Sequence, residues 1–365
     1  MSSFTTEAER RLREYREKID AIDEQVQVLL AERAAQAQMI ARIKHEHAPG
    51  ESFYRPEREA QVLERVAARH TGPLERDDVL RIFREIMAAC LALEQPLAVA
   101  YFGPEGSFTE AALRKHFGGA VEAVPLASIG DVFREVAAET VAFGVVPVEN
   151  SAEGVVTHTH DLFLHSSVRI VGEAVLRIHH QLMAKGEDPS VIRRVAAHPQ
   201  ALAQCREWLD VHWPALERLP VANNAEAARL AASDASLAAI ASLEAAARWG
   251  LTVIARNIED APDNSTRFLI IGRQAVGPSG KDKTSLILSA PNVPGALHAL
   301  LEPLARRGIS LARIQSRPAK GALWEYVFFV DILGHEDNPA IRDTLAEFER
   351  DGRLLRRLGS YPRAM

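Results

Sequence analysis

Two adjacent residues with complementary chemistry, Thr266 and Arg267, precede a short apolar run from Phe268 to Ile271. The run has the length of a buried strand, so both side chains are expected where a loop enters that strand. A Thr hydroxyl can donate a proton, and an Arg guanidinium can hold a carboxylate through two parallel hydrogen bonds. The alternative is a structural strand start, in which the Thr hydroxyl hydrogen-bonds a nearby backbone group. So short a motif does not decide between a functional and a structural role.

Further polar residues follow two predicted strands that end at Val148 and at Ala197. In open α/β sheets, ligands bind beyond the carboxyl ends of the strands, so these residues are candidates for the same site. The alternatives are a strand-end turn with a local hydrogen bond, or a solvated helix face. The candidates are Glu149, Asn150, Ser151, His198 and Gln204.

A long helix is predicted from Glu7 to His45, because apolar or small residues recur in alternating steps of three and four. Arg33 takes the position after Leu29, and a guanidinium on a packed face needs an anionic partner from protein or ligand. Lys44 lies about 20° round the helix and roughly 16 Å along it, so the two cations could hold a small dianion. The periodic positions are Leu12, Tyr15, Ile19, Ile22, Val26, Leu29, Gln36 and Ile40.

Arg16 would lie about 25 Å from Arg33 along this helix, too far to serve the same site in one chain. If it serves a similar site, that site belongs to a partner helix running the other way, which implies a dimer. A helix predicted over Glu75 to Gln95 places Glu94 one turn after Cys90 on its buried face. Burial would raise the pKa of that carboxyl group, so it could donate a hydrogen bond while neutral. The alternative is a coiled coil for dimerisation, with a few interhelical ion pairs.

The elements that must position these groups change character after Pro96, where short apolar strands begin to alternate with helices. This alternation predicts a doubly wound α/β module, built as two lobes. The loop from Phe102 to Phe108 is Gly-rich and leads into a helix whose first N–H groups could hold an anion. Its spacing is neither a phosphate loop nor a dinucleotide fingerprint.

A Gly- and Pro-containing stretch from Val276 to Asp282 predicts a linker, and the elements after it follow the order βαββαβ. The loop from Asn292 to Leu297 begins the first helix of that unit and could hold the polar end of an amino acid. The predicted domains are therefore an all-α unit at 1–96, a two-lobed α/β unit at 97–275 and an α+β, ferredoxin-like unit at 283–365.

The bulk composition excludes several classes of protein. A chain of 365 residues is long for one core, and a net charge of −6 gives no reason to expect nucleic acid. We expect no signal peptide and no membrane contact, because no uncharged apolar run approaches the roughly 20 residues that a spanning helix needs. Cys90 and Cys205 lie far apart and suit a reducing cytoplasm. None of the 13 histidines has a convincing metal spacing, so no metal is expected.

The N-terminal segments YREKIDAIDEQVQVLLAER, RPERE and FREIMAACLALEQ, with Lys44 between the first two, resemble the all-helical chorismate mutases fused to prephenate dehydratase. The resemblance covers the entire helical unit. It implies that Arg33, Arg58 and Arg16 of the partner subunit bind the carboxylates of chorismate. The reaction is a pericyclic rearrangement, so no nucleophile or cofactor is needed, and catalysis consists of holding one conformer and stabilising charge on the ether oxygen.

The same resemblance assigns the other candidates of the helical unit. It implies that Lys44 lies by the ether oxygen, that Glu59 lies by the ring hydroxyl, and that Cys90 lines the pocket. Some relatives carry Gln at the position of Glu94, so Glu94 must be protonated to hydrogen-bond the ether oxygen.

Four segments of the central unit, GPEGSF, VPVENSAEG, HPQALAQC and NSTRFLIIG, occur in the order found in prephenate dehydratases and resemble that family over the whole unit. The family reaction expels the ring hydroxyl of prephenate, loses carbon dioxide and gives phenylpyruvate, so it needs a proton donor and a clamp for two carboxylates. The resemblance implies that Thr266 is the general acid and that Arg267 holds a carboxylate. It also implies that Glu149, Asn150, Ser151, His198 and Gln204 line the site.

The C-terminal unit resembles an ACT regulatory domain through GAL at 295–297 and QSRP at 315–318. In relatives these two segments bind phenylalanine, the end product, although Glu is common where this chain has Gln315. The alternative is a purely structural dimerisation domain, since ACT sheets generally pair side by side. The residues implied are Asn292, Gly295, Ala296, Leu297, Gln315, Ser316, Arg317 and Pro318.

These resemblances together imply a bifunctional chorismate mutase and prephenate dehydratase of phenylalanine biosynthesis. They imply chorismate and prephenate as substrates, phenylalanine as inhibitor, no cofactor, and a homodimer or larger assembly. One rival is a non-catalytic ligand-binding protein, because two-lobed α/β units often only capture ligands. Another is a regulatory scaffold, for which the polar residues of the cleft would be dispensable.

Overall fold

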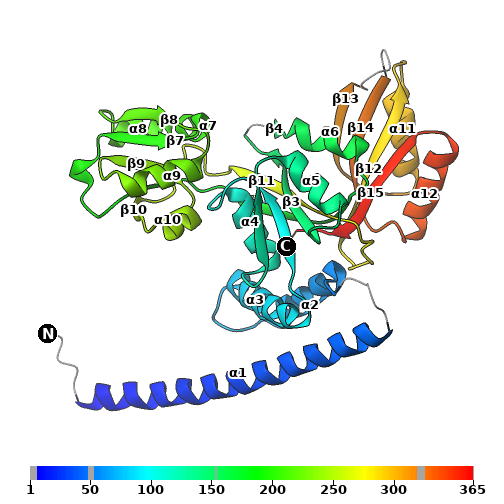
Figure 1. The fold of residues 1–365 in the computed structure, drawn as a ribbon. Coiled ribbons are helices and arrows are strands. Elements are labelled where there is room, and N and C mark those ends of the chain that lie inside the picture. Colours follow the sequence, from blue (N-terminus) through cyan, green and yellow to red (C-terminus); the bar gives the residue numbers. More distant parts are fainter. Residues whose placement is uncertain (1–5, 48–52, 153, 319–324, 365) are drawn as a thin grey trace.

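The computed structural model describes residues 6–47, 53–152, 154–318 and 325–364. These residues form three N-terminal helices, then two α/β lobes, then a C-terminal βαββαβ module (Figure 1). The fold class predicted from the sequence is confirmed: an all-α part, a two-lobed α/β part and an α+β part.

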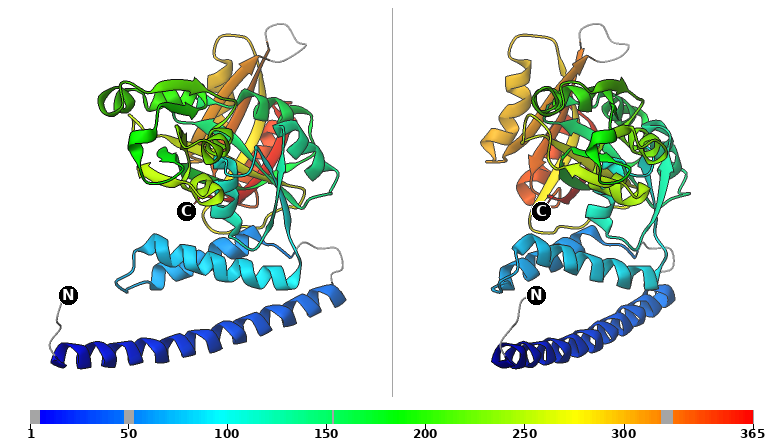
Figure 2. Two further views of the ribbon diagram at one scale, coloured as in Figure 1. Left: turned by 60° about the vertical axis from the view of Figure 1, so that its left-hand side comes forward. Right: turned by 90° about the vertical axis from the view of Figure 1, so that its left-hand side faces the viewer.

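The helical module consists of α1 (Thr6–His47), α2 (Pro56–Arg69) and α3 (Arg76–Glu94), and α1 is a single helix of 42 residues. Leu63 and Val66 of α2 pack against Leu80 of α3 in a small apolar cluster. The C-terminal part of α1 is covered at Ala37 and Ala41, two small buried residues that allow a close approach. In both views of Figure 2, α1 runs alongside α2 and α3 on the side away from the lobes.

The apolar stripe of α1 is uncovered in this single chain. Leu29, for example, keeps 63% of its surface exposed. A run of large apolar side chains on one helix face is typical of a helix that packs against another one. The exposed members are Leu12, Tyr15, Ile19, Ile22, Val26, Leu29 and Ile40.

The first lobe contains a six-stranded sheet in the order β2-β1-β3-β11-β5, with the short β4 paired to β3. β1, β2 and β3 are parallel, whereas β11 returns from the second lobe and runs antiparallel between β3 and β5. One face of this sheet packs against α4, and the other packs against α5 and α6. The bounds are β1 (Ala98–Phe102), α4 (Phe108–Phe117), β2 (Glu122–Leu126), α5 (Ile129–Ala137), β3 (Phe143–Asn150), β4 (Gly154–Val155), α6 (Thr157–His165), β5 (Arg169–Arg177) and β11 (Ser265–Gly272).

The second lobe contains a five-stranded sheet in the order β10-β6-β9-β7-β8. The central strand β9 reads LAAIA and is buried throughout, and the small residues of α9 pack directly on it. The bounds are β6 (Gln181–Ala184), a 3-10 turn (Pro189–Val191), β7 (Arg194–Ala197), α7 (Pro199–Gln204), α8 (Arg206–His212), β8 (Glu217–Pro220), α9 (Asn224–Ser233), β9 (Leu237–Ala241), α10 (Leu243–Trp249) and β10 (Thr252–Ala255).

The C-terminal module is a four-stranded antiparallel sheet in the order β13-β14-β12-β15. Leu300 of α11 and Phe348 of α12 cover one of its faces. The opposite face contributes Ile287 and Phe329 to the same core as α5 and α6, so this module is packed onto the first lobe. The bounds are β12 (Asp282–Pro291), α11 (Ala296–Arg306), β13 (Leu311–Pro318), β14 (Glu325–Leu333), α12 (Pro339–Arg350) and β15 (Leu354–Pro362).

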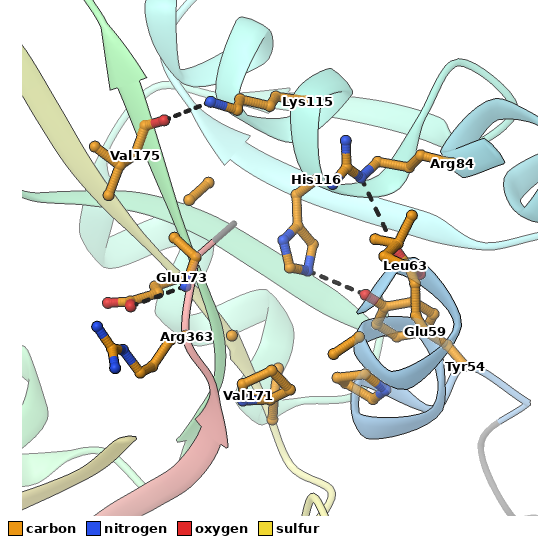
Figure 3. A pocket seen from close by; sticks show the side chains of 16 residues that line it. Tyr54, Glu59, Leu63, Arg84, Lys115, His116, Val171, Glu173, Val175 and Arg363 are labelled. Atoms are coloured by element: carbon orange, nitrogen blue, oxygen red, sulfur yellow. Dashed lines mark hydrogen bonds and ion pairs between the residues drawn. The ribbon is translucent and has the colours of Figure 1, made fainter. Parts of the chain in front are cut away.

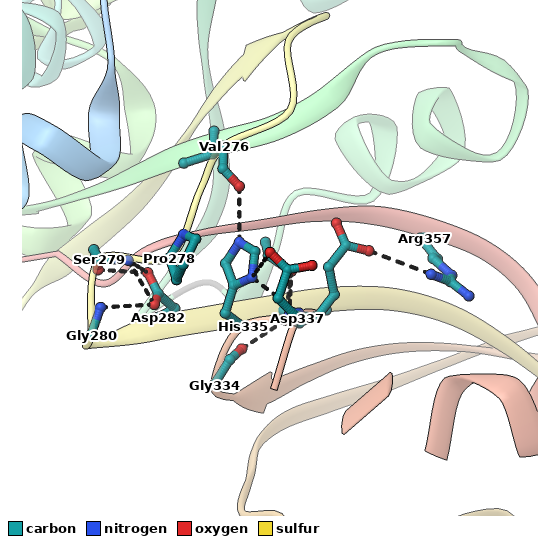
Figure 4. A network of polar contacts seen from close by, with 12 residues as sticks. Val276, Pro278, Ser279, Gly280, Asp282, Gly334, His335, Asp337 and Arg357 are labelled. Atoms are coloured by element: carbon teal, nitrogen blue, oxygen red, sulfur yellow. Dashed lines mark hydrogen bonds and ion pairs between the residues drawn. The ribbon is translucent and has the colours of Figure 1, made fainter. Parts of the chain in front are cut away.

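The segment predicted as a linker is held by polar contacts on both sides (Figure 4). The Asp282 carboxylate accepts hydrogen bonds from the N–H groups of Ser279 and Gly280 at 3.0 and 3.1 Å. The buried His335 donates from Nε2 to the Val276 carbonyl oxygen at 2.8 Å. These bonds fix the entry into β12, so the connection between the first lobe and the C-terminal module is well defined.

Candidate active sites

A cleft of about 720 Å³ lies between the two α/β lobes. Phe102, Leu126 and Asn150, which end the parallel strands β1, β2 and β3, line it from the first lobe. His198, which follows β7, lines it from the second lobe. The cleft therefore lies at the carboxyl ends of strands from both sheets, where doubly wound folds bind their ligands.

Thr266 and Asn150 meet inside this cleft because β11 and β3 pair in a register that sets them opposite each other. The Asn150 amide donates from Nδ2 to Thr266 Oγ1 at 2.8 Å and to Asn264 Oδ1 at 2.9 Å. Its own Oδ1 accepts the Ala152 N–H at 2.9 Å, which fixes the orientation of the amide. An N–H group that donates to a hydroxyl oxygen stabilises the anion left when that hydroxyl gives up its proton.

The network continues from Asn264 into the second lobe. Gln204 Oε1 accepts a hydrogen bond from Asn264 Nδ2 at 3.3 Å and lies 2.8 Å from Nε2 of His180. With Oε1 as the acceptor, His180 Nε2 carries the proton and Nδ1 is the acceptor nitrogen. Burial lowers the pKa of His180, which favours the neutral ring. His180 also lines the cleft, although it is not among the site residues predicted from the sequence, since no motif or metal spacing marks it.

None of the described residues that line the cleft is Arg or Lys, so helix N-termini are its main candidates for attracting an anion. α4 and α9 both begin at its wall, capped by Ser107 and Asn223. Ser107 Oγ accepts the Glu110 N–H at 3.3 Å, and Asn223 Oδ1 accepts the Glu226 N–H at 2.8 Å. The remaining N–H groups of such helix ends attract anions, as the sequence suggested for the first of these helices.

Three predicted site residues do not line the cleft. Arg267 follows Thr266 on β11, so its side chain points to the opposite face of the sheet. It pairs there with Glu173 at 2.8 Å and with Asp331 at 2.7 Å, which corrects the expectation that it shares the site of Thr266. Glu149 pairs with Arg313 at 3.0 Å for the same geometric reason.

Ser151 lies beyond the end of β3 and fastens the loop that precedes β11. Its Oγ accepts the Ser265 N–H at 2.9 Å and donates to the Asp263 carbonyl oxygen at 3.3 Å. It therefore supports the site from outside the cleft. His198 and Gln204, by contrast, both line the cleft, and His198 also caps α7 by accepting the Gln200 N–H on Nδ1 at 3.3 Å.

In the helical module, the structure brings Glu94 of α3 near Arg33 and Lys44 of α1. Burial raises the pKa of Glu94, and the two cations lower it only in part. Lys44 Nζ donates to the Phe53 carbonyl oxygen at 3.2 Å, while Cys90 is buried one turn before Glu94. These four predicted residues thus lie on the facing parts of α1 and α3.

Two further predicted arginines are solvent-exposed in this chain. Arg16 lies 17 residues before Arg33 on the same unbroken helix, about 25 Å away at 1.5 Å per residue. Arg58 lies on the exposed side of α2. In a single chain, neither completes the cluster formed by Arg33, Lys44 and Glu94.

Glu59 occupies a different place from the one expected (Figure 3). Its carboxylate faces a pocket of about 60 Å³ between α2 and the first lobe, 3.9 Å from Nε of Arg84. Burial raises its pKa to about 7. In the same pocket the Tyr54 hydroxyl lies 3.0 Å from Nε2 of His116, a ring whose pKa is lowered by burial to about 3.

The two segments predicted to bind phenylalanine lie at the same end of the C-terminal sheet, but the second does not line the hollow at the first. Gly295, with a left-handed φ of 84°, caps α11 and lines a hollow of about 490 Å³ together with Ala296. Asn292 and Leu297 are exposed beside it. The second segment lies on the sheet-edge strand β13, where Gln315 Nε2 donates to the Ser316 carbonyl oxygen, Arg317 pairs with Asp161 at 3.0 Å, and Pro318 ends the strand.

Comparison with known families accounts for all three parts of the chain. The family model of chorismate mutase type II matches residues 15–95, that of prephenate dehydratase matches residues 99–276, and that of the ACT domain matches residues 284–350. A bifunctional chorismate mutase/prephenate dehydratase from Pseudomonas aeruginosa is 53% identical over 97% of this chain and 98% of its own length. This chain belongs to the bifunctional chorismate mutase/prephenate dehydratase family. It is therefore an enzyme with two activities, an isomerase and a carbon–oxygen lyase, and it converts chorismate through prephenate to phenylpyruvate in phenylalanine biosynthesis.

Solved structures agree with the fold of the last two modules. A prephenate dehydratase from Arthrobacter aurescens in complex with L-Phe is 37% identical, with a TM-score of 0.67, over 73% of this chain and 90% of that one. A protein described as a novel type of quorum quenching acylase is 29% identical, with the same TM-score, over 73% of this chain and 98% of that one. Since one fold can carry different activities, residue chemistry must decide which groups act here. Among the described residues, no helix has the length and apolar character to cross a membrane.

Proposed function

We propose that the cleft between the lobes is the prephenate dehydratase site and that Thr266 is its general acid. The observation that supports this most directly is the 2.8 Å hydrogen bond from Asn150 Nδ2 to Thr266 Oγ1. A free Thr hydroxyl is a very weak acid, and a donor aimed at its oxygen lowers the cost of releasing the proton.

In the proposed reaction, the Thr266 hydroxyl protonates the ring hydroxyl of prephenate as the carbon–oxygen bond breaks and water leaves. The bond between the ring and its carboxylate breaks at the same stage, and its electron pair enters the ring as carbon dioxide departs. The ring becomes aromatic, and phenylpyruvate is formed. Asn150 stabilises the alkoxide left on Thr266, which regains its proton from solvent.

The two carboxylates of prephenate would be held by the ends of α4 and α9. Both helices have ten residues and begin at the cleft, so each presents uncapped N–H groups to an anion. His198 and Gln204 would orient the substrate from the second lobe. Arg267 has no part in this binding, because its guanidinium is engaged with two carboxylates on the other face of the sheet.

For the chorismate mutase reaction, we propose a site between α1 and α3 that contains Arg33, Lys44 and protonated Glu94, lined by Cys90. The raised pKa of Glu94 supports its role as a donor to the ether oxygen. Arg58 would contact a carboxylate after side-chain rearrangement, since it is exposed in the free chain.

We also propose that the enzyme is a homodimer joined along α1. The exposed stripe of this helix supports the proposal, as does the distance between Arg16 and Arg33, which only a second helix could bridge. An antiparallel partner helix would cover the stripe and bring its own Arg16 to the site of Arg33.

L-Phenylalanine is the proposed inhibitor, bound by the C-terminal module at the loop of Gly295 and at the segment from Gln315 to Pro318. The ACT family match and the relative crystallised with L-Phe support this assignment. Because the second segment does not line the hollow at Gly295 within one chain, the site would form between two C-terminal modules. Calorimetry without a binding signal for L-phenylalanine would contradict this assignment.

Replacement of Thr266 by two near-isosteric residues tests the dehydratase assignment. Thr266→Val keeps the shape but removes the hydroxyl, and Thr266→Ser keeps the hydroxyl but removes a methyl group. Prephenate turnover should fall by about 10²-fold or more in Thr266→Val and remain measurable in Thr266→Ser. Chorismate mutase activity should be unchanged in both. Equal turnover by the Val variant and the wild type would overturn the assignment.

A further inference from the structure

The paired strands β3 and β11 present charged residues on the face opposite the proposed dehydratase site. Asn150 and Thr266 are register partners whose side chains line the cleft. The neighbouring partners, Glu149 and Arg267, turn to the other face, where the C-terminal module is packed. Each proposed catalytic residue is thus followed or preceded by a charged residue that contacts a different module.

The contact surface on the C-terminal module is built from a second register pair. Arg313 of β13 lies opposite Asp331 of β14. Arg313 Nε pairs with Glu149 Oε2 at 3.0 Å, and Asp331 Oδ2 pairs with Arg267 Nη1 at 2.7 Å. Two adjacent residues of the C-terminal sheet therefore hold two adjacent residues of the catalytic sheet through ion pairs of opposite polarity.

The contacts of Arg267 are largely buried, whereas Glu149 keeps 36% of its side chain exposed at its pair with Arg313. Arg267 donates from Nε to Glu173 at 2.8 Å and from Nη2 to the Tyr361 hydroxyl at 3.0 Å, in addition to its bond with Asp331. Lys283 of β12 adds a second cation on Glu173 at 2.8 Å, so two cations face two carboxylates. A buried ion pair of this kind fixes geometry strongly, because separating the charges leaves one of them unpaired in a poorly solvated place.

We propose that Glu149 and Arg267 are positioning residues, through which Arg313 and Asp331 of the C-terminal module hold the Asn150–Thr266 pair in its productive geometry. This inference rests on the proposed role of Thr266. It also gives β13 a direct connection to the dehydratase site. Arg313 lies two residues before Gln315 on that strand, so a ligand that shifts the segment from Gln315 to Pro318 would act on Glu149 through Arg313.

A matched control distinguishes this positioning role from a role in holding the two modules together. Arg169 of β5 pairs with Glu336 of the C-terminal module at 3.0 Å, so it joins the same two modules. In the sheet, however, Arg169 lies opposite Gly272, six residues along β11 from Thr266 and roughly 20 Å away. Loss of the Arg169–Glu336 pair should weaken docking without moving the Asn150–Thr266 pair.

The test uses the full-length enzyme and measures kcat and KM for prephenate, with chorismate mutase activity as the internal standard of folding. Arg313→Gln and Asp331→Asn should each lower kcat for prephenate by about 10- to 100-fold, because small displacements of acting groups cost rates of that order. KM and chorismate mutase activity should stay within about threefold of wild type. The control variant Arg169→Gln should stay within about threefold in every parameter.

Two rescue variants keep the test decisive if a single variant folds poorly. Exchanging the charges, with Glu149→Arg and Arg313→Glu together, should recover at least about tenfold in kcat over the weaker single variant. The conservative Asp331→Glu variant should also be more active than Asp331→Asn.

The inference is overturned if Arg169→Gln loses as much kcat as Arg313→Gln, or if both C-terminal variants keep wild-type kcat. It is also overturned if the exchanged pair and Asp331→Glu show no recovery. Failure of the proposed function is a separate result, since it would appear as an active Thr266→Val enzyme whatever the ion pairs do.

Discussion

The sharpest test of the proposed acid is Asn150→Asp, which preserves the shape of the side chain and removes the N–H donor. In the structure that donor lies 2.8 Å from Thr266 Oγ1, and the opposite oxygen is fixed by the Ala152 N–H at 2.9 Å. The replacement carboxylate can keep the bond to Ala152 but cannot donate to Thr266. It also places a negative charge beside the oxygen that must become an alkoxide.

The size of the effect follows from two contributions. Loss of one donor to a developing oxyanion costs about 10²- to 10³-fold in kcat, or about 2.7–4 kcal/mol. Repulsion between two like charges about 4 Å apart adds about 4 kcal/mol at an effective dielectric constant of about 20. We therefore expect kcat for prephenate to fall at least about 10²-fold, with chorismate mutase activity unchanged.

The assay follows phenylpyruvate formed from prephenate by the full-length enzyme. Asn338→Asp is the matched control, because Asn338 caps α12 in the C-terminal module and Asp caps helices equally well. The control should keep wild-type kcat. Dehydratase activity within about threefold of wild type in Asn150→Asp would refute the idea that Asn150 polarises Thr266.

Three further predictions concern the other modules. Because burial raises the pKa of Glu94 and the protonated form is the proposed donor, chorismate mutase activity should fall as pH rises through that raised pKa. Glu94→Gln should remove this fall. A Glu94→Gln variant with the same pH profile as the wild type would contradict the proposed role of Glu94. Gly359→Ala would place a Cβ atom 2.3 Å from the Ile170 carbonyl oxygen, so the free energy of unfolding measured in urea should fall by about 1–3 kcal/mol. Gly352 also has a positive φ but has open space around it, so Gly352→Ala should lower the free energy of unfolding by less. Ile22→Lys on the exposed stripe of α1 should weaken dimerisation in sedimentation experiments and lower chorismate mutase activity. A monomeric variant with full chorismate mutase activity would contradict the proposal that the site needs Arg16 of the partner subunit.

Much of the fold could be predicted because the local signals were strong. The alternating steps of three and four predicted α1 almost to its ends, and the βαββαβ order of the C-terminal module is confirmed. The position of the cleft followed from the rule that ligands bind at the carboxyl ends of strands. The apolar stripe predicted on α1 is exposed in the single chain, which supports the proposed dimer.

The side-chain directions at the dehydratase site were harder to predict, although one signal was present. Thr266 and Arg267 are adjacent on a strand, so they had to point to opposite faces. The motif suggested instead that both face one substrate, because a resemblance preserves residue identity and says nothing about orientation. The same alternation separates Asn150 from Glu149, and both charged residues turn out to contact the C-terminal module.

Other features depend on long-range packing and could not be read from local sequence. His180 is connected to Asn264 through Gln204, and these three residues come from distant parts of the chain. Glu59 lies against the first lobe because Tyr54 packs between α2 and the core of that lobe, on the rings of Phe117 and Phe143. Neither contact leaves a periodic pattern along the sequence.

The central claim is that one chain carries two separate sites in series, and the most direct measurement supplies chorismate to variants of each site. Thr266→Val should consume chorismate normally and accumulate prephenate, with little phenylpyruvate. Arg33→Ala should leave chorismate unconverted yet turn added prephenate into phenylpyruvate at the wild-type rate. Phenylpyruvate production from chorismate at the wild-type rate by Thr266→Val, or loss of prephenate turnover in Arg33→Ala, would contradict the account.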